Sequence, residues 1–253
     1  MIQQQNISKD FWGDIYMCRH KKIIILVCAL LAILNIVACE QVKEDSANQR
    51  ESSIQAFEDI NLENIHQVNI SGNAKSIVIG QSANENFEFH NEDLNTAHTY
   101  DVHCDENGDV LDINIMMENA EEDNNILGSF HIDVPQKEFE KIEVTGDFGQ
   151  ISLYTINSDV LIYANNPFVY LDLEAEHLEH NITLNGSGAN TYRGVSVYLD
   201  KFPDNVKMEL NLIQGGTIND PQNILQENGL ESGTGKPVIS INHTKELNVY
   251  RKE

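Results

Sequence analysis

Histidine and cysteine side chains, which can hold a zinc ion, gather at two places in this sequence. His98, His103 and Cys104 lie close together, and His177 and His180 form a second pair. A zinc site needs three or four ligands that converge on the ion. His103 and Cys104 are adjacent, so on an extended strand they point to opposite faces and cannot reach the same ion. We therefore interpret these histidines as surface or edge residues, and we expect neither a metal site nor a cofactor.

Acidic residues offer a second kind of metal ligand. The run from Glu118 to Asn125 is rich in carboxylates and amides, which calcium prefers. It lacks the spacing of an EF-hand loop and the glycine–aspartate repeat of calcium-binding β-helices. We therefore interpret this run as a solvated loop.

Motifs of nucleophilic catalysis are missing from the sequence. It contains no Gly-x-Ser-x-Gly elbow and no Ser-x-x-Lys, His-Glu-x-x-His or Cys-x-x-Cys motif. The glycine pairs Gly186 with Gly188 and Gly233 with Gly235 are not followed by the Lys-Ser or Lys-Thr of a phosphate loop. The sequence therefore predicts a protein that is not an enzyme and has no catalytic residue.

The four cysteines are distributed so that no internal disulfide is expected. Cys18 and Cys28 lie near the N-terminus, and only Cys104 follows Cys39. The domain after Cys39 must then be held together by its core alone. Cys104 ends the strand-like stretch Tyr-Asp-Val-His-Cys, and no activating base lies nearby, so we expect a buried and unreactive thiol.

Cys39 is the residue to which the sequence assigns a chemical role. An apolar run from Ile23 to Ala38 follows the basic residues Lys21 and Lys22 and ends in small residues directly before Cys39. This is the layout of a secretory signal peptide. The cysteine after the small residue resembles the lipobox of bacterial lipoproteins. The resemblance implies that residues 1–38 are removed, that Cys39 carries the lipid, and that the protein sits on the extracytoplasmic face of the cell membrane.

An uncleaved membrane anchor is the alternative to a cleaved signal peptide. Spanning a bilayer takes about 20 apolar residues, whereas the run from Ile23 to Ala38 is shorter and contains Asn35. Both alternatives place the rest of the chain outside the cytoplasm, as Lys21 and Lys22 indicate.

Residues 1–16 fit a signal peptide poorly, because they include Asp10, Asp14 and Trp12. A start at Met17 gives the basic beginning Met-Cys-Arg-His-Lys-Lys that such signals have. We therefore expect translation to begin at Met17 rather than at Met1.

The stretch after Cys39 is polar and highly charged. It has almost no large apolar residues up to about Gln55, so it cannot bury enough surface to fold. We expect residues 39–58 to form a lipid-anchored flexible tether. The whole chain has a net charge of −24, and residues 1–38 hold four basic and two acidic residues, so the remainder is close to −26. Phosphate binding needs clustered Lys and Arg, so we expect no nucleic-acid partner.

Apolar and polar residues alternate through most of residues 59–253. A period of two is typical of half-buried β-strands. The alternating sets are Val68 and Ile70; Phe87 and Phe89; Tyr100 and Val102; Leu111, Ile113 and Ile115; Phe130, Ile132 and Val134; Ile142 and Val144; Ile151 and Leu153; Val160 and Ile162; Val169, Leu171 and Leu173; Ile182 and Leu184; Val195, Val197 and Leu199; Val206, Met208, Leu210 and Leu212; Ile239 and Ile241; and Leu247 and Val249. No segment in this region has a convincing helical period, so the sequence predicts an all-β domain over residues 59–253.

Turn residues separate these runs and define a short repeat. Ser71-Gly72-Asn73 and Thr145-Gly146-Asp147 are two of the predicted turns. Residues 141–158 and 159–176 form two successive units of two strands each. Units of this kind bury a core only when they stack. We therefore expect a β-solenoid, a β-helix-like stack of short strands, preceded by a signal helix and a disordered tether.

The sequence resembles the bacterial putative-adhesin domain family of unknown function, which is related to the head GIN domain of putative autotransporter adhesins. The similar parts are Val68–Gly80, Phe130–Pro135, Lys141–Val144, Gly149–Leu153 and Gly233–Asn242. The chain departs from the family in two places: the glycine-marked layers are weak between Leu153 and Leu184, and Thr191–Leu230 does not match the family pattern. The resemblance implies a β-solenoid and a surface location. It carries over no catalytic residue.

These features predict a cell-surface lipoprotein with a non-catalytic β-solenoid that acts in adhesion, surface binding or scaffolding. Its expected partners are the membrane, through the N-terminal lipid, and an unknown surface or protein ligand. A polysaccharide-binding or polysaccharide-active β-helix and an envelope signalling accessory protein are the alternatives. Acidic pairs or tyrosines aligned across successive layers would favour the polysaccharide alternative, which the lack of tryptophan after Trp12 weakens. A smooth polar face would favour a scaffold.

Overall fold

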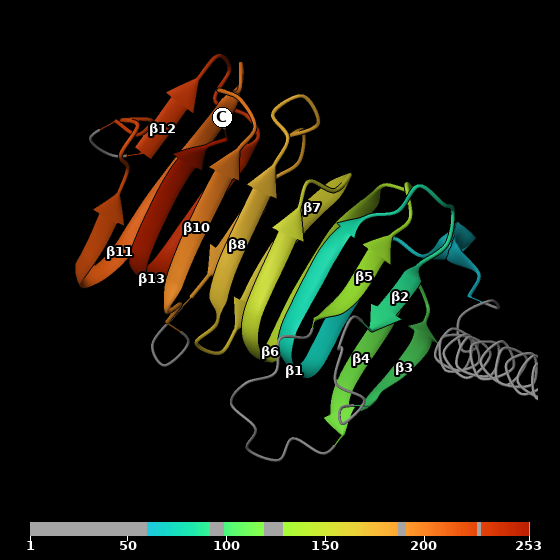
Figure 1. The fold of residues 1–253 in the computed structure, drawn as a ribbon. Helices are drawn as coiled ribbons and strands as arrows, with labels where there is room; N and C mark the ends of the chain where they lie inside the picture. The colour runs from blue at the N-terminus through green and yellow to red at the C-terminus, as the bar shows by residue number, and fades with distance from the viewer. Residues whose placement is uncertain (1–59, 92–98, 119–128, 187–190, 227–228, 253) are drawn as a thin grey trace, which may run out of the picture. The chain divides into compact units, whose positions relative to one another are not determined.

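The computed structural model describes residues 60–91, 99–118, 129–186, 191–226 and 229–252, all within the compact unit Ile54–Glu253 (Figure 1). The predicted signal peptide, Cys39, the predicted tether, His98 and most of the acidic run Glu118–Asn125 lie outside these residues. In the described ranges, no helix is long and apolar enough to cross a membrane. The described elements are one 3-10 turn, Leu62–Asn64, and thirteen strands, so the fold is all-β as predicted.

The strands follow one another along the whole described chain. They are β1 (Gln67–Gln81), β2 (Glu88–Asn91), β3 (Thr99–Asn107), β4 (Val110–Glu118), β5 (Phe130–Val134), β6 (Phe139–Tyr154), β7 (Ser158–Ala164), β8 (Phe168–Leu173), β9 (Ile182–Asn185), β10 (Gly194–Leu199), β11 (Val206–Asn219), β12 (Gly229–Ser232) and β13 (Val238–Arg251).

Most strands pair in parallel, and the long strands change partners halfway along. The first half of β1, Gln67–Asn73, pairs with β4, and its second half, Ile77–Gln81, pairs with β5. On its other side, both halves of β1 pair with β6. In the same way β7 and β8 pair with the two halves of β6, and β9 and β10 with the two halves of β13. A layer therefore consists of two strand segments, and layers stack side by side (Figure 1).

The two-strand units predicted at residues 141–158 and 159–176 are neighbouring layers. Ile142 pairs with Val160 and Ile151 pairs with Val169, an offset of 18 residues in both halves. The same offset separates the predicted units, so the repeat read from the sequence is a physical repeat of strand pairs.

Glycine allows the long strands to bend where turns were predicted. Gly72 and Gly146 pair with each other inside β1 and β6, with φ of 133° and 135°. A Cβ at Gly72 would lie 1.9 Å from the Ile115 carbonyl oxygen, and one at Gly146 would lie 2.2 Å from the Gly72 carbonyl oxygen. The predicted turns at these glycines are thus bends within continuous strands, at which only glycine fits.

The inward side chains of all layers form one hydrophobic core. Most members of the predicted alternating sets are buried; Tyr100, Val102 and Leu210 are only partly buried. Leu212 is also only partly buried, and the strand that carries it with Leu210, β11, lies near the end of the strand order. Tyr192 lies in Thr191–Leu230, the segment that departs from the family pattern. Its buried hydroxyl donates a 2.6 Å hydrogen bond to the Ile162 carbonyl oxygen.

The order of strands in space differs from their order in the sequence. The first strand, β1, lies between β4 and β6, and the last strand, β13, lies between β10 and β11 (Figure 1). Antiparallel strands join the outermost layers: β3 pairs with β4, β2 with β5 and β12 with β11. These short or antiparallel additions cover strand edges that would otherwise invite pairing with another chain.

Candidate binding face

A row of outward side chains crosses the second strand segments of the layers. Tyr154 on β6 pairs with Asp172 on β8, Asp172 with Tyr198 on β10, and Tyr198 with Tyr250 on β13. The residue directly before each of them is buried, so these four side chains point away from the core; the preceding residues are Leu153, Leu171, Val197 and Val249. We call Tyr154, Asp172, Tyr198 and Tyr250 the tyrosine row.

Contacts along the tyrosine row hold its side chains in place. The rings of Tyr198 and Tyr250 stack with centroids 5.3 Å apart and an angle of 22° between their planes. The Asn219 side-chain amide donates a 3.1 Å hydrogen bond to the Tyr250 hydroxyl. Lys252 forms an ion pair with Asp172, and the hydrogen bond to this carboxylate raises the pKa of Lys252. The stacked pair is thus part of the layer-to-layer packing, because each ring covers a face of the other.

Tyr154, at the other end of the tyrosine row, is 47% exposed. Its neighbour on β1 is Gly80, whose φ lies outside the left-handed region. A Cβ at Gly80 would lie 3.6 Å from Asp133 Oδ1 and 4.0 Å from Tyr154 Cδ2, which are ordinary contacts. The backbone therefore does not require glycine at this position. Because Gly80 has no side chain, the Tyr154 ring and the Asp133 carboxylate lie on either side of a space about as wide as one methyl group, which we call the Gly80 gap.

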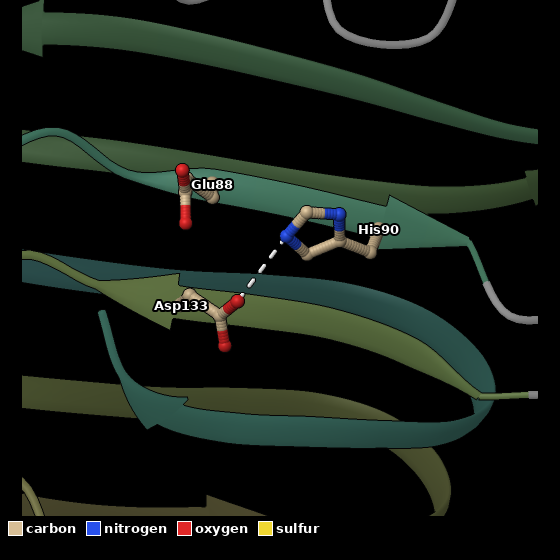
Figure 2. Close-up of side chains that lie close together, drawn as sticks. All are labelled: Glu88, His90 and Asp133. Carbon is tan, nitrogen blue, oxygen red and sulfur yellow. Dashed lines mark ion pairs between the residues drawn. The ribbon is translucent and has the colours of Figure 1, made fainter. Parts of the chain in front are cut away.

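Three side chains that can hold a metal or accept hydrogen bonds, those of Glu88, His90 and Asp133, lie close together (Figure 2). Asp133 is the residue on β5 that pairs with Gly80. Glu88 on β2 lies directly opposite Asp133 on β5, and His90 follows two residues later on the same face. His90 Nε2 lies 3.2 Å from Asp133 Oδ2. One potential ligand atom from each of the three residues lies within 4.8 Å of the others. We call Glu88, His90 and Asp133 the carboxylate–histidine group.

The Glu88 carboxylate is positioned by a buried neighbour. Ser82 Oγ donates to it at 3.2 Å and the Asn84 amide at 2.5 Å. Ser82 is only 4% exposed, and its backbone N–H donates to the Val134 carbonyl oxygen, which fixes it to the end of β5. The group offers two carboxylates and one imidazole, a set that can bind a divalent cation or the hydroxyl groups of a polar ligand.

The predicted histidine and cysteine candidates do not form one site. His103 is exposed beside Asp101, with His103 Nε2 2.9 Å from Asp101 Oδ2. Cys104 points the other way and packs against the core, as the strand alternation predicts. It is a free thiol, half-buried rather than fully buried. Burial and then the Asp105 charge raise its pKa to about 12, so it stays protonated.

His177 and His180 lie near one another but have separate partners. His177 Nδ1 is 2.9 Å from Glu174 Oε2, and His180 Nε2 is 2.9 Å from Asn157 Oδ1. Both border a small hollow that Tyr154 also lines. The two imidazoles do not converge on a third ligand in the described part of the chain.

Sequence reasoning missed the carboxylate–histidine group because its members come from two segments far apart. Glu88 and His90 are two residues apart, so both lie on the outward face of β2. The alternation of Phe87 and Phe89 already predicts this arrangement, so the spacing gave no separate indication of a site. Asp133 joins them only through the antiparallel pairing of β2 with β5. The period of two assigns each residue to a face, but it does not reveal which strand lies beside which.

The outward residues of the first strand segments provide a contrast. Asn114, Ser71, Thr145 and Tyr163 follow one another on β4, β1, β6 and β7. Tyr163 is 39% exposed and is flanked in sequence by the buried Ile162 and Ala164. Short polar side chains dominate this row. Its tyrosine, Tyr163, is exposed and lies apart from the tyrosine row, so it serves as a comparison residue.

Comparisons with known proteins give little further information. No protein-family model and no curated protein matches the chain. A crystal structure described as "a putative cell adhesion protein" from Clostridium sporogenes is similar over 78% of this chain and 98% of its own, with 14% sequence identity and a TM-score of 0.43. A likeness of this size does not carry function over to the present chain.

Proposed function

We propose that the protein is a non-catalytic cell-surface lipoprotein, anchored through Cys39, whose β-solenoid domain binds a surface or protein ligand. The observation that carries the binding role is the tyrosine row, in which aromatic side chains lie on three strands of one outward face and continue into the Gly80 gap. Tyrosine combines an apolar ring with a hydroxyl and is enriched at binding surfaces for this reason.

The solenoid assignment is supported by the repeated pairing of the layers. The β7/β8 and β9/β10 layers each have two strand segments, and the sequence offset between β6 and its neighbouring layer is the same in both halves. Such a stack presents long flat faces, which suit an extended ligand better than an enclosed substrate.

The polysaccharide-binding alternative gains support from the same row. Aligned tyrosines across successive layers were the feature expected of that alternative, and the contrasting row of Asn114, Ser71 and Thr145 is the smooth polar face expected of a scaffold. Because the protein has both rows, the tyrosine row can bind a ligand while the polar row acts as a plain support.

Crosslinking in intact cells tests the proposed function. The full-length protein is expected to capture a surface ligand, and a Tyr198→Ala/Tyr250→Ala variant is expected to lose that capture, whereas Tyr163→Ala retains it. Equal capture by the wild type and the row variant would contradict the proposal. Capture of only an envelope protein of the same cell, independent of the row, would favour the signalling accessory.

A further inference from the structure

We infer that a neutral pyranose sugar, the terminal or internal unit of a glycan, binds over Gly80 between the Tyr154 ring and the carboxylate–histidine group. This inference rests on the proposed surface-binding function and names its ligand class. It combines four features of the described residues: an exposed ring, a missing side chain, a paired set of carboxylates, and a strong negative charge.

The Gly80 gap gives the sugar a place to lie. The fold does not demand glycine at this position, since φ is not left-handed and a Cβ would make ordinary contacts. Asp133 Oδ1 and Tyr154 Cδ2 approach the Gly80 position from opposite sides, to 3.6 and 4.0 Å. The space between these two atoms is about as wide as one methyl group, so a sugar lying over Gly80 would touch the carboxylate and the aromatic ring together.

The two sides of the gap match the two faces of a sugar. A pyranose has an apolar surface of C–H groups, which packs against an aromatic ring such as that of Tyr154. Its hydroxyl groups donate hydrogen bonds, and an ionised carboxylate accepts them at two oxygens, so Asp133 and Glu88 suit neighbouring hydroxyls. His90 Nε2 faces Asp133 Oδ2 at 3.2 Å, so His90 helps to orient this carboxylate. Binding sites commonly combine an apolar wall with a few placed polar groups in this way.

Charge selects a neutral sugar. The chain carries a net charge of −24, and two of its carboxylates, those of Glu88 and Asp133, lie at the site itself. An acidic glycan, a phosphate or a sulfate would be repelled by this field. A neutral glycan gains its hydrogen bonds without that cost.

The tyrosine row allows the glycan to continue beyond the first sugar. Asp172, Tyr198 and Tyr250 follow Tyr154 on adjacent strands, which lie about 4.8 Å apart. A chain laid across the strands would meet polar and aromatic side chains in succession.

Binding of neutral oligosaccharides to the full-length, detergent-solubilised protein tests the inference. The probes are soluble glucose, mannose and N-acetylglucosamine oligosaccharides, titrated by calorimetry in buffer containing EDTA. We expect saturable binding by at least one probe, which Tyr154→Ala and Asp133→Ala each weaken by about tenfold. Tyr163→Ala, an exposed tyrosine on the contrasting row, serves as the matched control and should bind as the wild type does.

Filling the gap gives a second, independent test. Gly80→Val should abolish binding while preserving the melting temperature, because β-branched residues suit strands. Gly80→Ala, whose added carbon makes only ordinary contacts, replaces it should the valine variant fail to fold.

Three results would overturn the inference: no binding of any neutral probe, binding that survives both Tyr154→Ala and Gly80→Ala, or binding that needs a divalent cation. The proposed function is tested separately by the cell-surface capture. Capture that depends on the tyrosine row, without glycan binding, would contradict the sugar ligand and leave the surface-binding function standing. Absence of both capture and glycan binding would contradict both proposals.

Discussion

At the scale of single residues, the fold lowers the reactivity of the Cys104 thiol. Burial, with a smaller contribution from the Asp105 charge, raises its pKa from the ordinary value of 9.0 to about 12. The thiolate is the reactive form, so we expect a maleimide to label Cys104 slowly in the native protein at about pH 8 and rapidly in denaturant. Labelling can be followed by mass spectrometry, and a Cys104→Ser variant is the blank. Equal rates in the two conditions would show that the thiol is accessible and ionised.

The same pKa shift fixes the direction of a pH effect on stability. The native state holds the Cys104 proton more tightly than the unfolded state does, because the folded-state pKa is raised. Stability from this group is therefore complete below the ordinary pKa of 9.0 and is lost as the pH rises towards about 12. The free energy of unfolding in urea, measured for the wild type and for Cys104→Ser across this pH range, isolates the contribution of Cys104.

Individual residues also show where sequence reasoning succeeded and where it failed. The opposite directions of His103 and Cys104 follow from strand geometry alone, and the structure confirms them. The meeting of Glu88 with Asp133 depends on a pairing between distant segments. Sequence alternation contains the first kind of information and lacks the second.

At the scale of elements, the bends in β1 and β6 depend on two glycines that touch each other. A Cβ at Gly146 would lie 2.2 Å from the Gly72 carbonyl oxygen, and its φ is 135°. We expect Gly146→Ala to reduce the free energy of unfolding by about 2–4 kcal/mol, through both the clash and the strained backbone. Denaturant unfolding measures this loss.

Gly108 provides the matched control for this prediction. It also has a positive φ, 72°, but a Cβ there would meet no atom within 4 Å. Gly108→Ala should therefore show only the backbone cost of about 1–2 kcal/mol. If Gly146→Ala lowers the free energy of unfolding by no more than this, the bend in β6 accommodates the added Cβ without a clash, which would contradict the prediction.

The strand order shows the limit of prediction for elements. Alternation located nearly every described strand, and the 18-residue offset of two layers was visible as a repeat. The insertion of β1 between β4 and β6, and of β13 between β10 and β11, left no trace in the sequence pattern. Inward residues of every layer are the same kinds of aliphatic side chain, so a layer's composition does not identify its neighbours.

At the scale of the whole molecule, the proposed membrane attachment through Cys39 can be tested directly. The chain's net charge of −24 opposes direct binding to an anionic bilayer, so the proposal assigns attachment to the lipid on Cys39. We therefore expect a Cys39→Ser variant to lose incorporation of labelled fatty acid and to leave the detergent-rich phase on partitioning. Cys104→Ser, which removes the thiol of the domain, should retain both properties. Unchanged partitioning of Cys39→Ser without lipid label would instead identify Ile23–Ala38 as an uncleaved anchor, because that apolar run would then be what holds the protein to the membrane.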